Sequence, residues 1–144
     1  EALASVLQAN QAAGHQTMWV AHSQGGELFS EAMNIAAANG ASDLSMNTVR
    51  FNAGANNWLV TNSNADNLGI TVTGYYGSPL DIVPNFVGLN GNIFSIPISL
   101  IMAPTLFMSD LSPHTEPRDD WYMLQPGTGA MGPFPSPMGP FPPR

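Results

Sequence analysis

The stretch WVAHSQGGELF, residues 19–29, decides the fold of this chain. The run TMWVAH at residues 17–22 is apolar and contains aromatic and β-branched residues, so it predicts a buried strand. Residues 25–38, GGELFSEAMNIAAA, repeat apolar side chains at helical spacing and are followed by an Asn-Gly pair, which predicts a helix with a defined end. A strand, a tight turn at Ser23 and a helix therefore follow one another without a gap.

This order is the one that a nucleophile elbow requires. A serine on a sharp strand-to-helix turn adopts a strained backbone, so small residues are needed on either side of it. Here the pattern is Ala21-x-Ser23-x-Gly25, with alanine at a position where glycine is commoner. The helix directs its N-terminus at the serine, and the backbone N–H of Gln24 can donate to an oxyanion. A Ser-x-Gly turn ahead of a helix also arises by chance, so the motif needs support from the rest of the chain.

Further strands and helices extend on both sides of this stretch. Strands are predicted at residues 47–52 (NTVRFN) and 70–76 (ITVTGYY), a helix at residues 1–13, and a short helix with a loop within residues 53–69. Strands that alternate with helices indicate an α/β fold, a parallel sheet with helices on both faces. Two apolar stretches interrupted by proline, at residues 80–88 and 93–108, fit neither pattern and receive no assignment.

The composition excludes several classes of function. The 144 residues carry three cations and ten acids, a formal charge of −7, so a nucleic-acid partner is not expected. Cysteine is absent, which excludes disulfides, thiolate zinc sites and a cysteine nucleophile. The three histidines, His15, His22 and His114, are too dispersed to predict a metal site, and no cofactor is expected. The apolar stretch at residues 93–108 is too short and too interrupted by proline to span a membrane.

The chain divides into two parts, a folded region at residues 1–125 and a Pro/Gly-rich tail at residues 126–144. The tail repeats MGPFP at residues 131–135 and 138–142, a composition that predicts extended, polyproline-like backbone. Its phenylalanines could instead form a strip that docks on a partner. The chain begins with helix-like sequence, without an initiator methionine or a signal peptide, and we interpret it as part of a longer protein. Its surface polarity comes from Asn, Ser and Thr more than from charge, which favours an exported or secreted protein.

The string AHSQGG resembles the nucleophile elbow of bacterial lipases in the α/β-hydrolase superfamily, some of which read GHSQGG and others AHSMGG. In these hydrolases the chain order of the triad is Ser, then Asp or Glu, then His. Asp81, in GSPLDIVP directly after the third predicted strand, resembles the acid loop of lipases. It also lies where open α/β sheets gather their functional residues, past the carboxyl end of a strand.

The base that the resemblance implies is His114, the only histidine after this acid. Ser23 would then attack an ester carbonyl, His114 would take its proton, and Asp81 would hold the imidazole in the correct tautomer. The Gln24 N–H would face the oxyanion. Without the chain order of the three residues, His114 would be interpreted as a histidine on an exposed loop. The histidine at position 22 is structural in lipases, and His15 precedes the strand.

Other carboxylates compete with Asp81 for the role of the acid. Asp110, four residues before the predicted base, is the second choice. Asp66 precedes the third strand, whereas Asp119 and Asp120 follow the base and have the pattern of surface charge.

The resemblance covers residues 1–120 and corresponds to the back half of a hydrolase. It implies a lipase or phospholipase acting on a lipid or small ester, in the context of the C-terminal effector or toxin region of a larger exported protein, and it leaves contact with a membrane surface open. Residues 93–108 would suit an acyl chain or form a core strand.

The front strands and a second oxyanion donor are not seen, so the first strand would lie at an open sheet edge that an upstream segment or a partner chain could complete. The alternative function is a non-catalytic interaction module that keeps a hydrolase framework and binds through its tail.

Overall fold

The computed structural model describes residues 1–77, 81–91, 95–104, 114 and 122–124. The strands predicted at residues 17–22 and 47–52 are confirmed, and the third begins and ends one residue later than expected. The apolar stretches without an assignment contain a short π-helix and an α-helix. The elements, in chain order, are α1 (Ala2–Ala13), β1 (Thr17–His22), α2 (Gln24–Ala38), β2 (Asn47–Asn52), α3 (Trp58–Asn67), β3 (Thr71–Gly77), η1 (Val83–Val87), α4 (Ser95–Met102) and β4 (Tyr122–Leu124).

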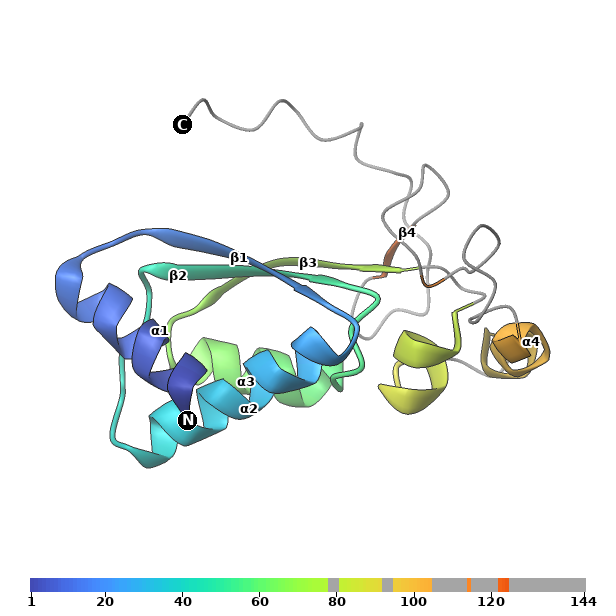
Figure 1. Ribbon diagram of the computed structural model, residues 1–144, viewed down its shortest axis with the longest axis horizontal. Helices are drawn as coiled ribbons and strands as arrows, with labels where there is room; N and C mark the ends of the chain where they lie inside the picture. The colour runs from blue at the N-terminus through green and yellow to red at the C-terminus, as the bar shows by residue number, and fades with distance from the viewer. Residues whose placement is uncertain (78–80, 92–94, 105–113, 115–121, 125–144) are drawn as a thin grey trace, which may run out of the picture.

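The strands form one sheet in the order β1-β2-β3-β4 (Figure 1). The first three are parallel, and β4 pairs antiparallel with the end of β3. This arrangement confirms the α/β class. It also places β1 at an edge of the sheet, as expected. Because β1, β2 and β3 are parallel, the residues that follow each of them lie along the same edge of the sheet.

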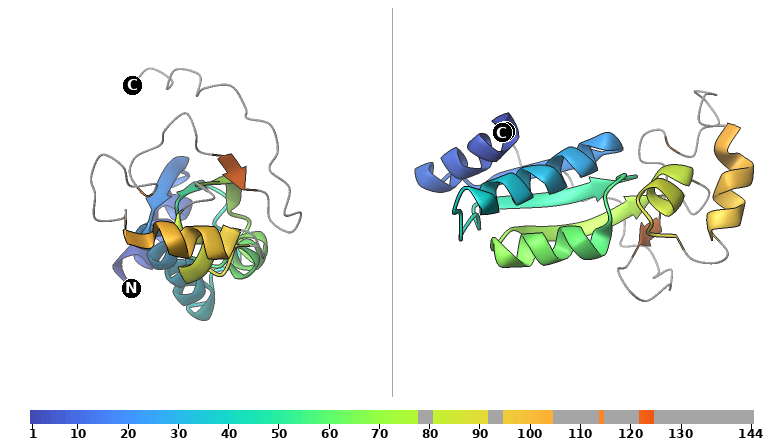
Figure 2. Two further views of the ribbon diagram at one scale, coloured as in Figure 1. Left: turned by 90° about the vertical axis from the view of Figure 1, so that its right-hand side faces the viewer. Right: turned by 90° about the horizontal axis from the view of Figure 1, so that it is seen from below.

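In the part of the chain that the structure describes, the helices that flank the sheet lie on one of its faces, whereas the alternation of elements predicted helices on both faces. Figures 1 and 2 show α1, α2 and α3 together on one side. The physical reason is the strand order: the chain steps from β1 to β2 to β3 in a single direction, and right-handed crossovers then place both connecting helices on the same face. Helices on the second face would require the strand order to reverse. The helix α1 packs against α2 on that same side.

The hydrophobic core fills the space between the sheet and these helices. Along β2, alternate side chains point toward the helices, and Val49 and Phe51 are fully buried. Phe51 stacks on Tyr75 of β3, with ring centroids 5.0 Å apart, and meets Phe29 of α2 edge-on. Fully burying one such apolar side chain stabilises the fold by about 1.5–3 kcal/mol. The core thus fixes β2 and β3 against the helix that follows the elbow.

The Tyr75 hydroxyl is the polar group of this aromatic cluster. It donates a hydrogen bond of 2.9 Å to Asn62 Oδ1 in α3. Burial raises the pKa of Tyr75 well above its usual value, and the nearby charge of Asp66 acts in the same direction. The hydroxyl therefore stays protonated and remains a donor that ties β3 to α3.

The other face of the sheet carries polar and exposed apolar side chains. On β1, Met18 is 67% exposed, and Val20 is also exposed. Arg50 of β2 lies over the ring of Tyr76 at 3.9 Å from its centroid and donates through Nε to Asn52 Oδ1.

Within the described residues, no helix is long and apolar enough to cross a membrane.

Candidate active site

Ser23 occupies the turn between β1 and α2 in the backbone conformation that an elbow requires. Its φ of 53° and ψ of −125° are unusual for a residue with a side chain, and such strain costs of order 1–3 kcal/mol. Three hydrogen bonds hold it there: its N–H donates to the Asn52 carbonyl, and its carbonyl accepts from the N–H groups of Gly26 and Ala55, each at 3.0–3.1 Å. The end of β2 and the loop after it therefore fix the turn.

Gly26, in the first turn of α2, is required by a close approach rather than by its backbone angles. A Cβ at this position would overlap the Oδ1 of Asn56 and would lie 3.1 Å from Gly54 Cα. Gly25 differs, because a Cβ there would meet nothing within 4 Å. The second glycine of the motif thus lets α2 begin directly against the loop that follows β2.

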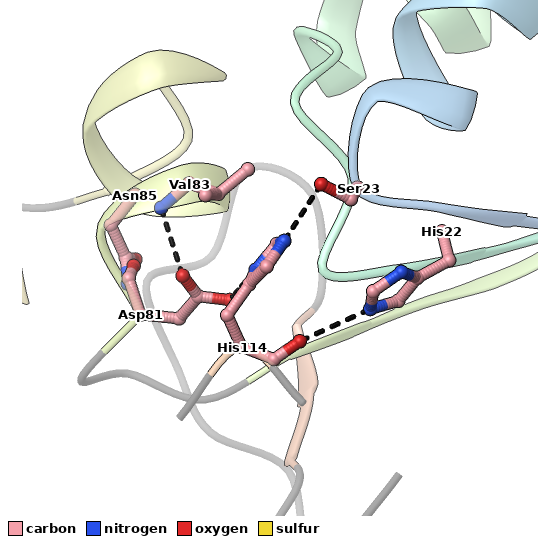
Figure 3. Close-up of polar contacts among 6 residues, drawn as sticks. All are labelled: His22, Ser23, Asp81, Val83, Asn85 and His114. Carbon is pink, nitrogen blue, oxygen red and sulfur yellow. Dashed lines mark hydrogen bonds and ion pairs between the residues drawn. The ribbon is translucent and has the colours of Figure 1, made fainter. Parts of the chain in front are cut away.

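Asp81 follows β3 and is fully buried. One carboxylate oxygen, Oδ1, accepts the N–H of Val83 at 2.9 Å, and the Asp81 carbonyl accepts from the Asn85 side chain at 2.6 Å. Both partners belong to the π-helix η1, so the turn that Asp81 begins also holds its side chain (Figure 3). The other oxygen, Oδ2, remains directed at His114.

The segment that bears the acid is fastened to the loop that holds the elbow. The side chain of Asn90 donates to the carbonyl of Asn56 at 2.8 Å and accepts the N–H of Trp58 at 2.9 Å. Gly88 permits this approach, since a Cβ there would lie 3.0 Å from the Asn56 carbonyl oxygen. The loop after β2 therefore contacts both the nucleophile and the acid segment, and it sets their separation.

His114 lies between Ser23 and Asp81 and contacts both through its ring nitrogens (Figure 3). Its Nδ1 is 2.7 Å from Asp81 Oδ2, and its Nε2 is 2.7 Å from Ser23 Oγ. An ionised carboxylate can only accept, so the network assigns the proton to Nδ1 and leaves Nε2 to accept from the serine hydroxyl. The imidazole is 18% exposed, so it can be reached from solvent. This is the geometry of a nucleophile, a base and an orienting acid.

The structure brings together the three residues that the sequence singled out as the triad: Ser23, Asp81 and His114. Gln24 is the first residue of α2, where backbone N–H groups have no partner within the helix. Its N–H therefore lies at the turn beside Ser23. The catalytic roles of these four residues remain predictions.

The competing residues lie elsewhere or outside the described part of the chain. Asp66 is near the C-terminal end of α3, which returns to the amino ends of the strands, and His15 precedes β1 at that same end. Both are thus at the opposite end of the sheet from Ser23. The second-choice acid Asp110, the carboxylates Asp119 and Asp120, and the tail at residues 126–144 lie outside the described residues.

Sequence reasoning missed the residues that support the triad. Asn56 and Asn90 belong to asparagine-rich loops whose composition signals polarity but no particular partner. His22 was interpreted as structural, but it is exposed and contacts His114. The only available signal for His22 was its place beside the nucleophile.

The described residues hold no group of three or more His, Cys, Asp or Glu side chains arranged to bind a metal ion. No family model, curated protein or solved structure matches this chain.

Proposed function

We propose that this protein is a serine hydrolase that cleaves carboxylic esters through Ser23, His114 and Asp81. The observation that carries the proposal is the pair of 2.7 Å contacts of the His114 ring. They join residues that are 33 and 91 positions away in the sequence. A chance contact would not be expected to place a strained serine, an imidazole and a buried carboxylate in the order that acyl transfer requires.

The reaction proceeds in two halves. Ser23 Oγ forms a bond to the ester carbonyl carbon while its proton passes to His114 Nε2, and the carbonyl oxygen takes the negative charge facing the Gln24 N–H. The intermediate collapses, the alcohol leaves with the proton from His114, and an acyl-serine remains. Water then attacks this ester with His114 again as the base, which releases the carboxylic acid and restores Ser23. Asp81 stabilises the imidazolium in both halves.

The arrangement of the elements supports an α/β-hydrolase-like fold as part of this proposal. The nucleophile follows the first of three parallel strands and the acid follows the third, so both come from the carboxyl edge of the sheet. The acid segment and α4 also expose apolar side chains, with Leu89 at 73% and Ile101 at 77%. Figure 2 shows η1 and α4 beyond the carboxyl ends of the strands, the edge of the sheet at which β1 leads into Ser23. Apolar surface there favours an ester with an acyl chain, such as a lipid.

The test is covalent labelling with a fluorophosphonate, which reacts with activated serines. We expect the native chain to take up one label and to hydrolyse short p-nitrophenyl esters. Ser23→Ala should lose the label and reduce kcat by at least about a thousandfold, because the covalent path is removed. Ser63→Ala, at an exposed serine of α3, is the matched control and should behave as the native chain.

Labelling that persists in Ser23→Ala would show that another residue is the nucleophile. A folded native chain that takes up no label and cleaves no ester would contradict the hydrolase proposal and would favour the non-catalytic interaction module.

A further inference from the structure

His22, the last residue of β1, contacts the predicted base. Its Nε2–H donates to the backbone carbonyl of His114 at 3.2 Å, as Figure 3 shows. The two imidazole rings also approach each other, with centroids 5.1 Å apart and planes inclined by 35°. His22 thus contacts His114 at its backbone and at its ring, whereas Ser23 and Asp81 contact the two ring nitrogens.

The His22 end of this contact is held by the sheet. His22 belongs to a strand that pairs with β2 along its whole length, and its own partner in the register is Asn52. Asn52 also accepts the N–H of Ser23, so His22 and the nucleophile are fixed to the same point of β2. The hydrogen bond from His22 to the His114 carbonyl therefore links the backbone of the predicted base to the part of the sheet that also holds the nucleophile.

A general base must keep a fixed position relative to the nucleophile. His114 Nε2 must stay within hydrogen-bond reach of Ser23 Oγ while it takes the proton and then of the leaving oxygen while it returns it. The contacts at the two ring nitrogens hold the His114 ring against Ser23 and Asp81. The contact at the carbonyl adds a point of attachment on the His114 backbone, which restrains the orientation of the ring further. A displacement of about 1 Å in a catalytic group can reduce the rate about a hundredfold.

We propose that His22 is a positioning residue for this reaction, which holds the His114 ring in register with Ser23 through the Nε2–H to carbonyl hydrogen bond. The inference rests on the proposed function, since it assigns His22 a part in the same site. His22 is exposed, so removing its side chain loses little buried apolar area. Its effect on the rate should therefore exceed its effect on the free energy of unfolding.

Two substitutions separate the hydrogen bond from the ring contact. His22→Phe keeps an aromatic ring but has no donor, and His22→Gln keeps an N–H donor at similar reach without the ring. We expect His22→Phe to lower kcat about tenfold to a hundredfold with little change in KM, and to slow fluorophosphonate labelling to the same extent. His22→Gln should recover most of the lost rate. Val20→Thr, on the same exposed face of β1, is the matched control and should leave kcat unchanged.

The low-field proton resonance of the His114 Nδ1–H provides a readout that does not depend on substrate. It should be sharp in the native chain and in His22→Gln, and broadened in His22→Phe, because a less restrained ring exchanges its proton faster with water.

The outcomes are distinguishable from those of the proposed function. Absence of labelling in the native chain would overturn the hydrolase proposal and this inference with it. Normal labelling of the native chain with equal kcat in His22→Phe would overturn the positioning role alone. A second result would also overturn the positioning role: if His22→Phe and His22→Gln lose the same thermal stability and the same fraction of kcat, the role of His22 is structural.

Discussion

The nucleophile and the acid–base pair of this site are held in different ways. Ser23 lies in a continuous run of strand, turn and helix, and hydrogen bonds between backbone groups hold its main chain. Asp81 and His114 come after β3 in the chain, and each of the hydrogen bonds described for them above involves a side chain. Backbone contacts within regular structure tolerate substitution, but a contact made by one side chain is lost with that side chain.

This difference predicts where the site is sensitive. Apart from loss of the Ser23 hydroxyl itself, substitutions in the elbow should act through steric clashes and stability, because Gly26 is packed closely against the loop after β2. Substitutions in the acid–base region should act through the rate, because they release a catalytic group without unfolding the sheet.

The largest effect is expected at the acid. Asp81→Asn should lower kcat by about 10⁴-fold, because an amide no longer fixes the proton on His114 Nδ1 and cannot stabilise the imidazolium. The measurement is ester hydrolysis by folded protein, with folding checked by circular dichroism. Asp66→Asn, at the other end of the sheet, is the control and should retain full activity. A mild loss in Asp81→Asn would move the role of the acid to another carboxylate.

Within the elbow, two adjacent glycines should respond in opposite directions. Gly26→Ala should destabilise the protein by about 1–3 kcal/mol, because its methyl group would overlap the buried Asn56 side chain. Gly25→Ala should stabilise it by up to about 1 kcal/mol, because alanine favours the helix and the space is open. Urea unfolding of both variants decides the point, and equal stabilities would show that α2 does not pack against the loop as described.

The link between the two regions is tested at Asn90. Asn90→Ala removes an acceptor for the Trp58 N–H and a donor to the Asn56 carbonyl, which should lower stability by about 1–2 kcal/mol. We also expect kcat to fall while KM changes little, because the acid segment loses its fixed distance from the elbow. Asn64→Ala, which breaks an asparagine pair on the helical surface, serves as the comparison. If both variants behave alike, the acid segment is held by other contacts.

The smallest effect is expected at Asp43, in the connection between α2 and β2 and away from both regions. The backbone N–H and the side chain of Ser45 lower the pKa of the Asp43 carboxyl, and its Oδ2 also accepts from Gln11. A lowered pKa in the folded state means that the ionised carboxylate stabilises the fold at neutral pH and that this contribution is lost as pH falls through the folded pKa. Asp43→Asn should therefore melt slightly below the native chain at pH 7.

The difference in melting temperature between these two proteins should vanish in acid, and kcat should be the same in both at neutral pH. A gap that widened toward low pH would show that the Asp43 carboxylate destabilises the fold.

The sequence by itself determined the strand and the helix on either side of Ser23. The strands at residues 17–22 and 47–52 were located from short runs that contain apolar and β-branched side chains, because such runs are a local property of the chain. The small residues beside Ser23 indicated the strained turn for the same reason. Chain order and the position after a strand, taken together with the resemblance to lipases, led to Asp81 and His114 as the predicted acid and base.

Only the tertiary structure decided how these parts meet. The helices α1, α2 and α3 lie on one face of the sheet because β1, β2 and β3 follow one another across it in a single direction. No local sequence pattern specifies the order in which strands are arranged in a sheet. The amide of Asn90 and the imidazole of His22 acquire their partners from segments 34 and 92 positions away. The sequence around Asn90 and His22 indicated only that these side chains are polar. Their partners could not be predicted, because a hydrogen bond between distant segments depends on where the packed core places the two backbones.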